Sequence, residues 1–158
     1  YPPKLHPEDL LIKAINRSWI EFCNNISLYT FQLSIKVSED EFKDTLELML
    51  NDFDLVENCL EDPPFFNGEQ FSLVDSSYAP VFQRLDFLEQ IYKRIITQER
   101  HPKLATWKEN LLSLKAVKHS AVEDIQSLYY KLLWTRQGYI SQYLSEEDYG
   151  KRPPKSTY

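Results

Sequence analysis

Two series of apolar residues with the period of an α-helix limit the possible folds of this chain more than any other feature. Residues separated by alternating steps of four and three lie on one face of a helix, so each series predicts an amphipathic helix. The first series is Ile15, Trp19, Phe22, Ile26, Tyr29 and Leu33. The second is Phe42, Leu46, Met49, Phe53, Val56 and Leu60. Both stop at proline or turn residues before four heptads, which favours antiparallel bundle helices over a coiled coil.

Capping signals mark where the second and third helices begin. Ser38 and Glu41, and again Ser72 and Asp75, have the spacing of a capping box. In such a box the serine oxygen accepts a backbone N–H of the first turn, and the acidic side chain accepts the N–H of the serine. The second pair follows Asn67-Gly68, which is a turn signal. Ser72 and Asp75 are therefore expected to serve folding rather than catalysis.

The third predicted helix is apolar along one face and contains a proline. Its apolar positions are Val74, Tyr78, Val81, Leu85, Leu88, Tyr92 and Ile95. Pro80 is expected to kink it, because proline removes a backbone donor and clashes with the preceding turn. A break between residues 82 and 89 would instead divide this segment into two helices.

The remainder of the chain continues the helical pattern. A shorter helix is predicted after His101-Pro102, and a last one from about Val122 to Tyr143, with Gly138 as its weakest point. Residues 31–37 are the one short segment that also fits a strand. The predicted fold class is therefore all-α, a helical bundle.

Composition excludes several classes of function. The 158 residues carry 18 Lys and Arg against 24 Asp and Glu, a net charge of −6, which disfavours nucleic-acid binding. No apolar run approaches the length of a membrane span, so no membrane association is predicted. The histidines lack ligand-like spacing, and no metal site is predicted. Cys23 and Cys59 are too few for a disulfide framework, which favours a reducing, cytoplasmic location.

The order of the motifs resembles the C-terminal helical domain of the glutathione transferase superfamily. The resemblance rests on Phe65-Phe66-Asn67-Gly68, Phe71-Ser72-Leu73-Val74-Asp75 and His101-Pro102-Lys103-Leu104-Ala105-Thr106-Trp107. An omega-like branch is indicated by residues 80–85, 137–144 and 148–150. In this interpretation residues 1–7 are the remnant of an interdomain connector, 8–144 form a substrate-binding domain and 145–158 form a polar tail.

The resemblance also implies how the work is divided in a parent protein. Glutathione, as co-substrate, and the catalytic residue would belong to an N-terminal thioredoxin-like domain that is absent here. This chain would hold an electrophile or a disulfide and contribute to a possible homodimer, and would be inactive alone. The alternative is a non-catalytic protein interaction module of the same superfamily. A thioredoxin-like sequence upstream, with a catalytic Cys, Ser or Tyr, would favour the enzyme.

Candidate substrate-binding residues lie on the last predicted helix. Arg136, Tyr139, Ile140 and Tyr143 would share one helical face, and phenol rings beside a guanidinium suit a flat, partly polar or anionic ligand. The resemblance adds Arg84 to this pocket and includes Tyr139, Ile140 and Tyr143 in it. Tyr29, late on the first predicted helix, is a further candidate. The alternatives are docking of the last helix by its aromatic residues, an ion pair at Arg84, and core packing of Tyr29.

Two positions depart from the superfamily pattern. An apolar residue is expected after Asp75, where it would pack on Phe71, but Ser76 stands there. A tryptophan is expected directly before Gln137-Gly138, but Arg136 occupies that position and the tryptophan is Trp134.

Overall fold

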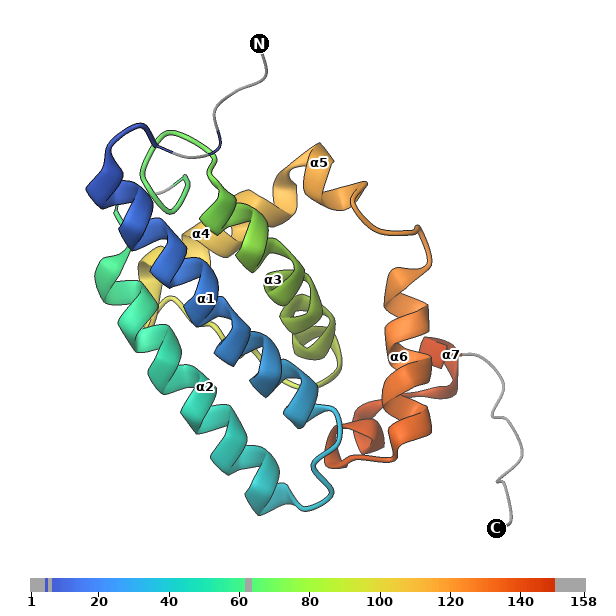
Figure 1. Ribbon diagram of the computed structural model, residues 1–158. Helices are drawn as coiled ribbons and strands as arrows, with labels where there is room; N and C mark the ends of the chain where they lie inside the picture. The colour runs from blue at the N-terminus through green and yellow to red at the C-terminus, as the bar shows by residue number, and fades with distance from the viewer. Residues whose placement is uncertain (1–4, 6, 62–63, 150–158) are drawn as a thin grey trace.

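The computed structural model describes residues 5, 7–61 and 64–149, and within them the fold is a bundle of helices (Figure 1). The elements are α1 (Leu10–Leu33), α2 (Glu39–Cys59), α3 (Leu73–Ile91), α4 (Pro102–Ser113), α5 (Lys115–Lys118), α6 (Ile125–Arg136), the 3₁₀ helix η1 (Tyr139–Tyr143) and α7 (Glu146–Tyr149). No strand occurs in the described ranges, where a single isolated bridge joins Phe65 and Gly68. The predicted all-α class is confirmed.

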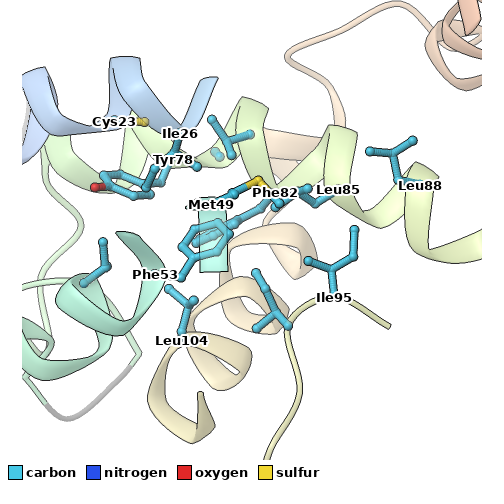
Figure 2. Close-up of a cluster of buried hydrophobic side chains, with 14 of the residues drawn as sticks. Cys23, Ile26, Met49, Phe53, Tyr78, Phe82, Leu85, Leu88, Ile95 and Leu104 are labelled. Carbon is cyan, nitrogen blue, oxygen red and sulfur yellow. The ribbon is translucent and has the colours of Figure 1, made fainter. Parts of the chain in front are cut away.

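The helices α1, α2 and α3 form the front of the bundle, and α4 crosses behind them (Figure 1). The second predicted stripe is confirmed in full, since all six of its residues are buried, five of them in α2 and Leu60 at its C-cap. They pack with residues of α1, α3 and α4, among them Ile26, Tyr78 and Leu104, in one apolar core (Figure 2). This burial is the main stabilising contribution to the fold.

The buried face of α1 is rotated from the predicted stripe. Ile15 is 46% exposed, whereas its neighbour Asn16 and the later residues Cys23 and Thr30 are buried beside Ile26. The reason is that α1 packs against both α2 and α3. The side chains of α1 that face these two helices are buried, and this face differs from the predicted apolar stripe. The hydroxyl of Thr30 donates to the Ser27 carbonyl at 2.7 Å, which satisfies it within the helix.

The carboxylate of Asp75 is fully buried and accepts four hydrogen bonds. Ser72 and Asp75 form the predicted capping box, and both the backbone N–H and the hydroxyl of Ser72 donate to Oδ2 at 2.7 Å. The other oxygen, Oδ1, accepts the Phe66 N–H at 2.8 Å and the Trp107 indole N–H at 2.7 Å. One side chain thus joins the turn before α3, the start of α3 and the middle of α4.

The start of α4 is held by acidic residues of α2. Glu57 accepts the backbone N–H groups of Lys103 at 3.0 Å and Leu104 at 2.7 Å. These are donors that an isolated helix leaves without a partner, and a carboxylate there is favoured by the helix dipole. The buried His101 ring lies 2.7 Å from Asp54. The predicted boundary at His101-Pro102 is confirmed as the start of α4.

Helix α3 is continuous across Pro80, so the alternative of two helices does not occur. It ends at Ile91, four residues before the predicted last apolar position. Glu89 explains this end, because its Oε1 accepts the N–H groups of both Ile95 and Ile96 at 3.0 Å. These amides are thereby satisfied outside a helix.

The last predicted helix, from about Val122 to Tyr143, was wrong as a single element. Helix α6 ends at Arg136, Gln137 adopts the left-handed region with φ 53°, and η1 follows Gly138. Gly138 lies against the chain after α1: a Cβ there would be 2.8 Å from the Ser34 carbonyl oxygen. The Tyr139 N–H donates to the Lys36 carbonyl at 2.6 Å. These contacts with the chain after α1 compete with continuation of the helix.

The two ends of the chain are described only in part. Of the predicted connector 1–7, residues 1–4 and 6 lie outside the described ranges. Helix α7 falls within the predicted polar tail, of which residues 150–158 also lie outside them.

Replacing Asp75 with alanine is expected to destabilise the fold more than loss of the helix cap alone. The buried Trp107 and Phe66 N–H groups would lose their acceptor, at about 1–3 kcal/mol each. We expect a loss of about 3 kcal/mol for Asp75→Ala and about 1 kcal/mol for Ser72→Ala. Thermal unfolding followed by circular dichroism measures both. Asp44→Ala, at an exposed position of α2, is the control. Equal melting temperatures for all three variants would contradict this role of Asp75.

The break after α6 gives a second test, because the two possible structures predict opposite results. In a continuous helix, Gly138→Ala would stabilise and Gln137→Gly would destabilise, each by about 1 kcal/mol. With the observed break, Gly138→Ala meets backbone atoms of residues 34 and 36 and should cost about 1–3 kcal/mol. Gln137→Gly relieves a left-handed residue and should be neutral or stabilising. Urea unfolding of both variants decides between the two.

Candidate functional site

A cleft lies between the C-terminal half of α1, the middle of α3 and the length of α6. Its volume is about 480 Å³, within the usual range for a small-molecule site. It is lined by Ser27, Thr30, Phe31, Ser34, Arg84, Ile125, Leu128, Tyr129, Leu132 and Arg136. We call it the α1–α3–α6 cleft. A smaller hollow of about 230 Å³ shares Arg84, Ile125 and Tyr129 with it.

Two arginines from distant parts of the sequence line this cleft, and none of the described residues that line it is acidic. Arg84 of α3 donates to the Pro80 carbonyl at 3.2 Å. Arg136 of α6 donates to the Ser34 hydroxyl, and its guanidinium lies 4.7 Å from the centre of the Phe31 ring. These contacts hold Arg136 against α1 while leaving most of its N–H donors available.

Tyr129 lines the same cleft as the two arginines, and both guanidinium groups act electrostatically on its hydroxyl. Its hydroxyl is buried and has no hydrogen-bond partner among the described residues. Burial raises the pKa of Tyr129 to about 12, although the guanidinium groups of Arg84 and Arg136 act in the opposite direction. The phenol is therefore protonated at neutral pH and can donate a hydrogen bond.

Apolar side chains form the walls of the cleft. Phe31, Leu128 and Leu132 are 47%, 44% and 41% exposed, and Ile125 is half-buried. Several large apolar side chains exposed side by side are characteristic of a binding surface rather than of ordinary surface. The cleft therefore combines apolar walls with a small set of convergent donors, as ligand sites do.

The residues predicted as one site are divided between two places. Arg84 and Arg136 meet in the α1–α3–α6 cleft, and Arg84 has no ion-pair partner among the described residues. Tyr139, Ile140 and Tyr143 do not line it. They lie on η1, past the break at residues 137–138.

The aromatic residues of η1 pack on α2 and the end of α3. The Tyr139 ring centre is 5.1 Å from that of Phe42, and the Tyr143 ring centre is 5.0 Å from that of Tyr92. The two tyrosine hydroxyls are 2.9 Å apart, and Ile140 is fully buried. This arrangement corresponds to the docking alternative. Tyr29 is half-buried against the core and does not line the cleft either.

The cleft also contains residues that the sequence reasoning missed. Ile125, Tyr129, Leu132 and Arg136 are spaced by four, three and four residues, the same signal that identified the first helices. This series lies on one face of α6 and could have been found from the sequence. Phe31 and Ser34 carry no such signal, because only the packing of α6 beside the end of α1 gives them a role.

A second cavity, of about 660 Å³, is larger but has a different character. It lies between the start of α1 and residues 67–72, and is lined by Leu5, Pro7, Glu8, Ile12, Glu61, Asn67, Gly68, Glu69, Gln70, Phe71 and Ser72. Among the described residues that line it, three are acidic and none is basic. Phe71, whose expected apolar partner is replaced by Ser76, packs on Phe65 there at 5.6 Å between ring centres. The α1–α3–α6 cleft remains the candidate site because its donors converge.

Two further findings concern the described residues only. No group of three or more His, Cys, Asp or Glu side chains within them is arranged to hold a metal ion. None of their helices is both long and apolar enough to cross a lipid bilayer.

Comparison with known proteins identifies the relatives of this chain. Residues 39–109 match the family described as "Glutathione S-transferase, C-terminal domain". A "Probable glutathione S-transferase" of Glycine max is 29% identical over 118 residues, which cover 68% of this chain and 48% of the relative. One of Nicotiana tabacum is 26% identical over 121 residues, which cover 75% of this chain and 53% of the relative. The chain thus spans about half the length of these curated relatives. Residues 39–109 are thus similar to the C-terminal domain of glutathione S-transferases, and the all-helical fold agrees with this similarity.

Proposed function

We propose that the α1–α3–α6 cleft forms the co-substrate side of a glutathione-dependent transferase or thiol transferase. The observation that carries this proposal is the cleft itself, a cavity of about 480 Å³ with apolar walls and two arginines. In the parent protein, a thioredoxin-like domain would bind glutathione and supply the catalytic residue. This chain would then hold an electrophile, or a disulfide, beside the attacking sulfur.

The proposed chemistry is attack by a thiolate whose pKa is lowered by its surroundings. Cys23 is unsuited to that role, because burial raises the pKa of its thiol to about 11 and its S–H donates to the Ser77 carbonyl at 3.3 Å. The thiol is therefore protonated at neutral pH. The contribution of this domain would be to place the second reactant, which removes much of the entropic cost of a bimolecular step.

Three finer expectations belong to the same proposal. They are an omega-like branch, a homodimer and a cytoplasmic location, and they stay predictions. Separation by size would test the homodimer in the parent protein.

The first test compares this chain with the parent protein. The isolated 158-residue chain is expected to show no glutathione conjugation and no thiol transfer, because the proposed nucleophile lies in the other domain. The parent protein is expected to show one of the two activities, measured with a chromogenic aryl halide and with a mixed disulfide. Turnover by the isolated chain would contradict this division of roles, and an inactive parent would contradict the transferase.

A second test fills the cleft in the parent protein. Leu128 is 44% exposed on the cleft wall, so Leu128→Trp adds bulk there without burial in the core. We expect kcat/KM for the electrophile to fall about tenfold or more, the cost of losing one or more good contacts, while KM for glutathione is unchanged. The matched control is Leu55→Trp, at a 51% exposed position of α2 that does not line the cleft. Equal kinetics for the two variants would remove the cleft from the proposal.

A further inference from the structure

The charge of the α1–α3–α6 cleft is opposite to that of the chain. The chain has a net charge of −6, yet the described residues that line its cleft include two arginines and no carboxylate. Some basic residues elsewhere form ion pairs: Arg100 is 3.1 Å from Glu47 and 2.9 Å from Asp54. Within the described residues, neither Arg84 nor Arg136 forms such an ion pair. A local excess of positive charge in a concave site attracts an anion.

The two guanidinium groups differ in how firmly they are placed. Arg136 is fixed by the Phe31 ring and by its hydrogen bond to the Ser34 hydroxyl. Arg84 is exposed and makes its hydrogen bond to the Pro80 carbonyl with Nη1. A guanidinium presents five N–H donors in a planar fork that matches the two oxygens of a carboxylate. Both arginines therefore have N–H donors left to bind a carboxylate.

The unpartnered hydroxyl of Tyr129 is a third donor in the same place. A buried hydroxyl without a partner is costly, and such groups are uncommon in folded proteins. A ligand oxygen that accepts this hydrogen bond would remove the cost. Because Tyr129 is protonated at neutral pH, it would add a donor without adding a negative charge.

The walls define the other half of the ligand. Leu128 and Leu132 of α6 lie on the same cleft as the Phe31 ring of α1. Flat apolar groups fit between such surfaces, and aromatic rings gain additional energy from ring contacts.

We propose that the α1–α3–α6 cleft binds a flat aromatic carboxylate. Its acid group would lie on the side of Arg84, Tyr129 and Arg136, and its ring would lie against Phe31 and Leu128. The role of this compound as a co-substrate rests on the proposed function. Its binding does not, because every residue named belongs to this chain.

The experiment measures the binding of 2-naphthoate and of its neutral amide, 2-naphthamide, to the 158-residue chain by isothermal titration calorimetry. The two probes share one ring system and differ in charge. We expect the acid to bind at least about tenfold more tightly, since hydrogen bonds to charged groups are worth that factor or more. We also expect its affinity, but not that of the amide, to fall as salt is added.

Three variants assign the preference to residues. Arg84→Gln and Arg136→Gln are each expected to remove most of the tenfold preference, and Tyr129→Phe to weaken binding of the acid severalfold. Arg17→Gln is the matched control, since Arg17 is exposed on α1 and does not line the cleft. Because Arg136 also contacts α1, Arg136→Lys is included: it keeps the charge but loses the planar fork. Melting curves verify that each variant is folded.

The outcomes separate this inference from the proposed function. Equal affinity for acid and amide, no binding of either, or an unchanged preference in both arginine-to-glutamine variants would each overturn it. Turnover of a neutral electrophile by the parent protein would still support the transferase. Conversely, acid binding with an inactive parent would support the inference and contradict the transferase.

Discussion

The buried carboxylate of Asp75 is the interaction on which the arrangement of this domain depends. It accepts hydrogen bonds from the turn before α3, from the start of α3 and from Trp107 of α4. A buried carboxylate is favourable only when its oxygens have partners, so these three segments must come together for any of them to be stable. The position of α3 follows, and with it the position of Arg84.

Apolar periodicity and capping motifs correctly predicted the helices that bury the same face along their whole length. All six apolar residues of the α2 series are buried, and Ser38 and Ser72 begin the helices that their capping boxes predicted. The face of α1 could not be read in the same way. Two neighbours share that helix, and they bury Asn16 and Thr30 in preference to a more apolar face. Periodicity reports a helix, and packing decides which side is covered.

Only part of the candidate site was predicted, again because tertiary packing decides where some of its residues lie. Arg84 and Arg136 were singled out and lie in one cleft, but Tyr139 and Tyr143 were assigned to the same face of a helix that in fact ends at residue 136. The break comes from Gly138, whose contact with the chain after α1 joins residues about a hundred positions apart. A glycine in a helical pattern signals only a weak point. The contact of Gly138 with the chain after α1 ends the helix at this weak point and turns the chain into η1.

Helix α6 is attached to the bundle near both of its ends. The Gln126 side chain donates to that of Gln90 at 2.7 Å, and the Tyr139 N–H donates to the Lys36 carbonyl beyond the other end. Between these attachments each added or removed residue turns the following side chains by about 100° around the helix axis. An insertion after Tyr129 would therefore carry Arg136 away from Phe31 while Tyr129 stayed in place. The length of α6 thus determines which side chains face the cleft, and this effect is separate from the choice of amino acids along the helix.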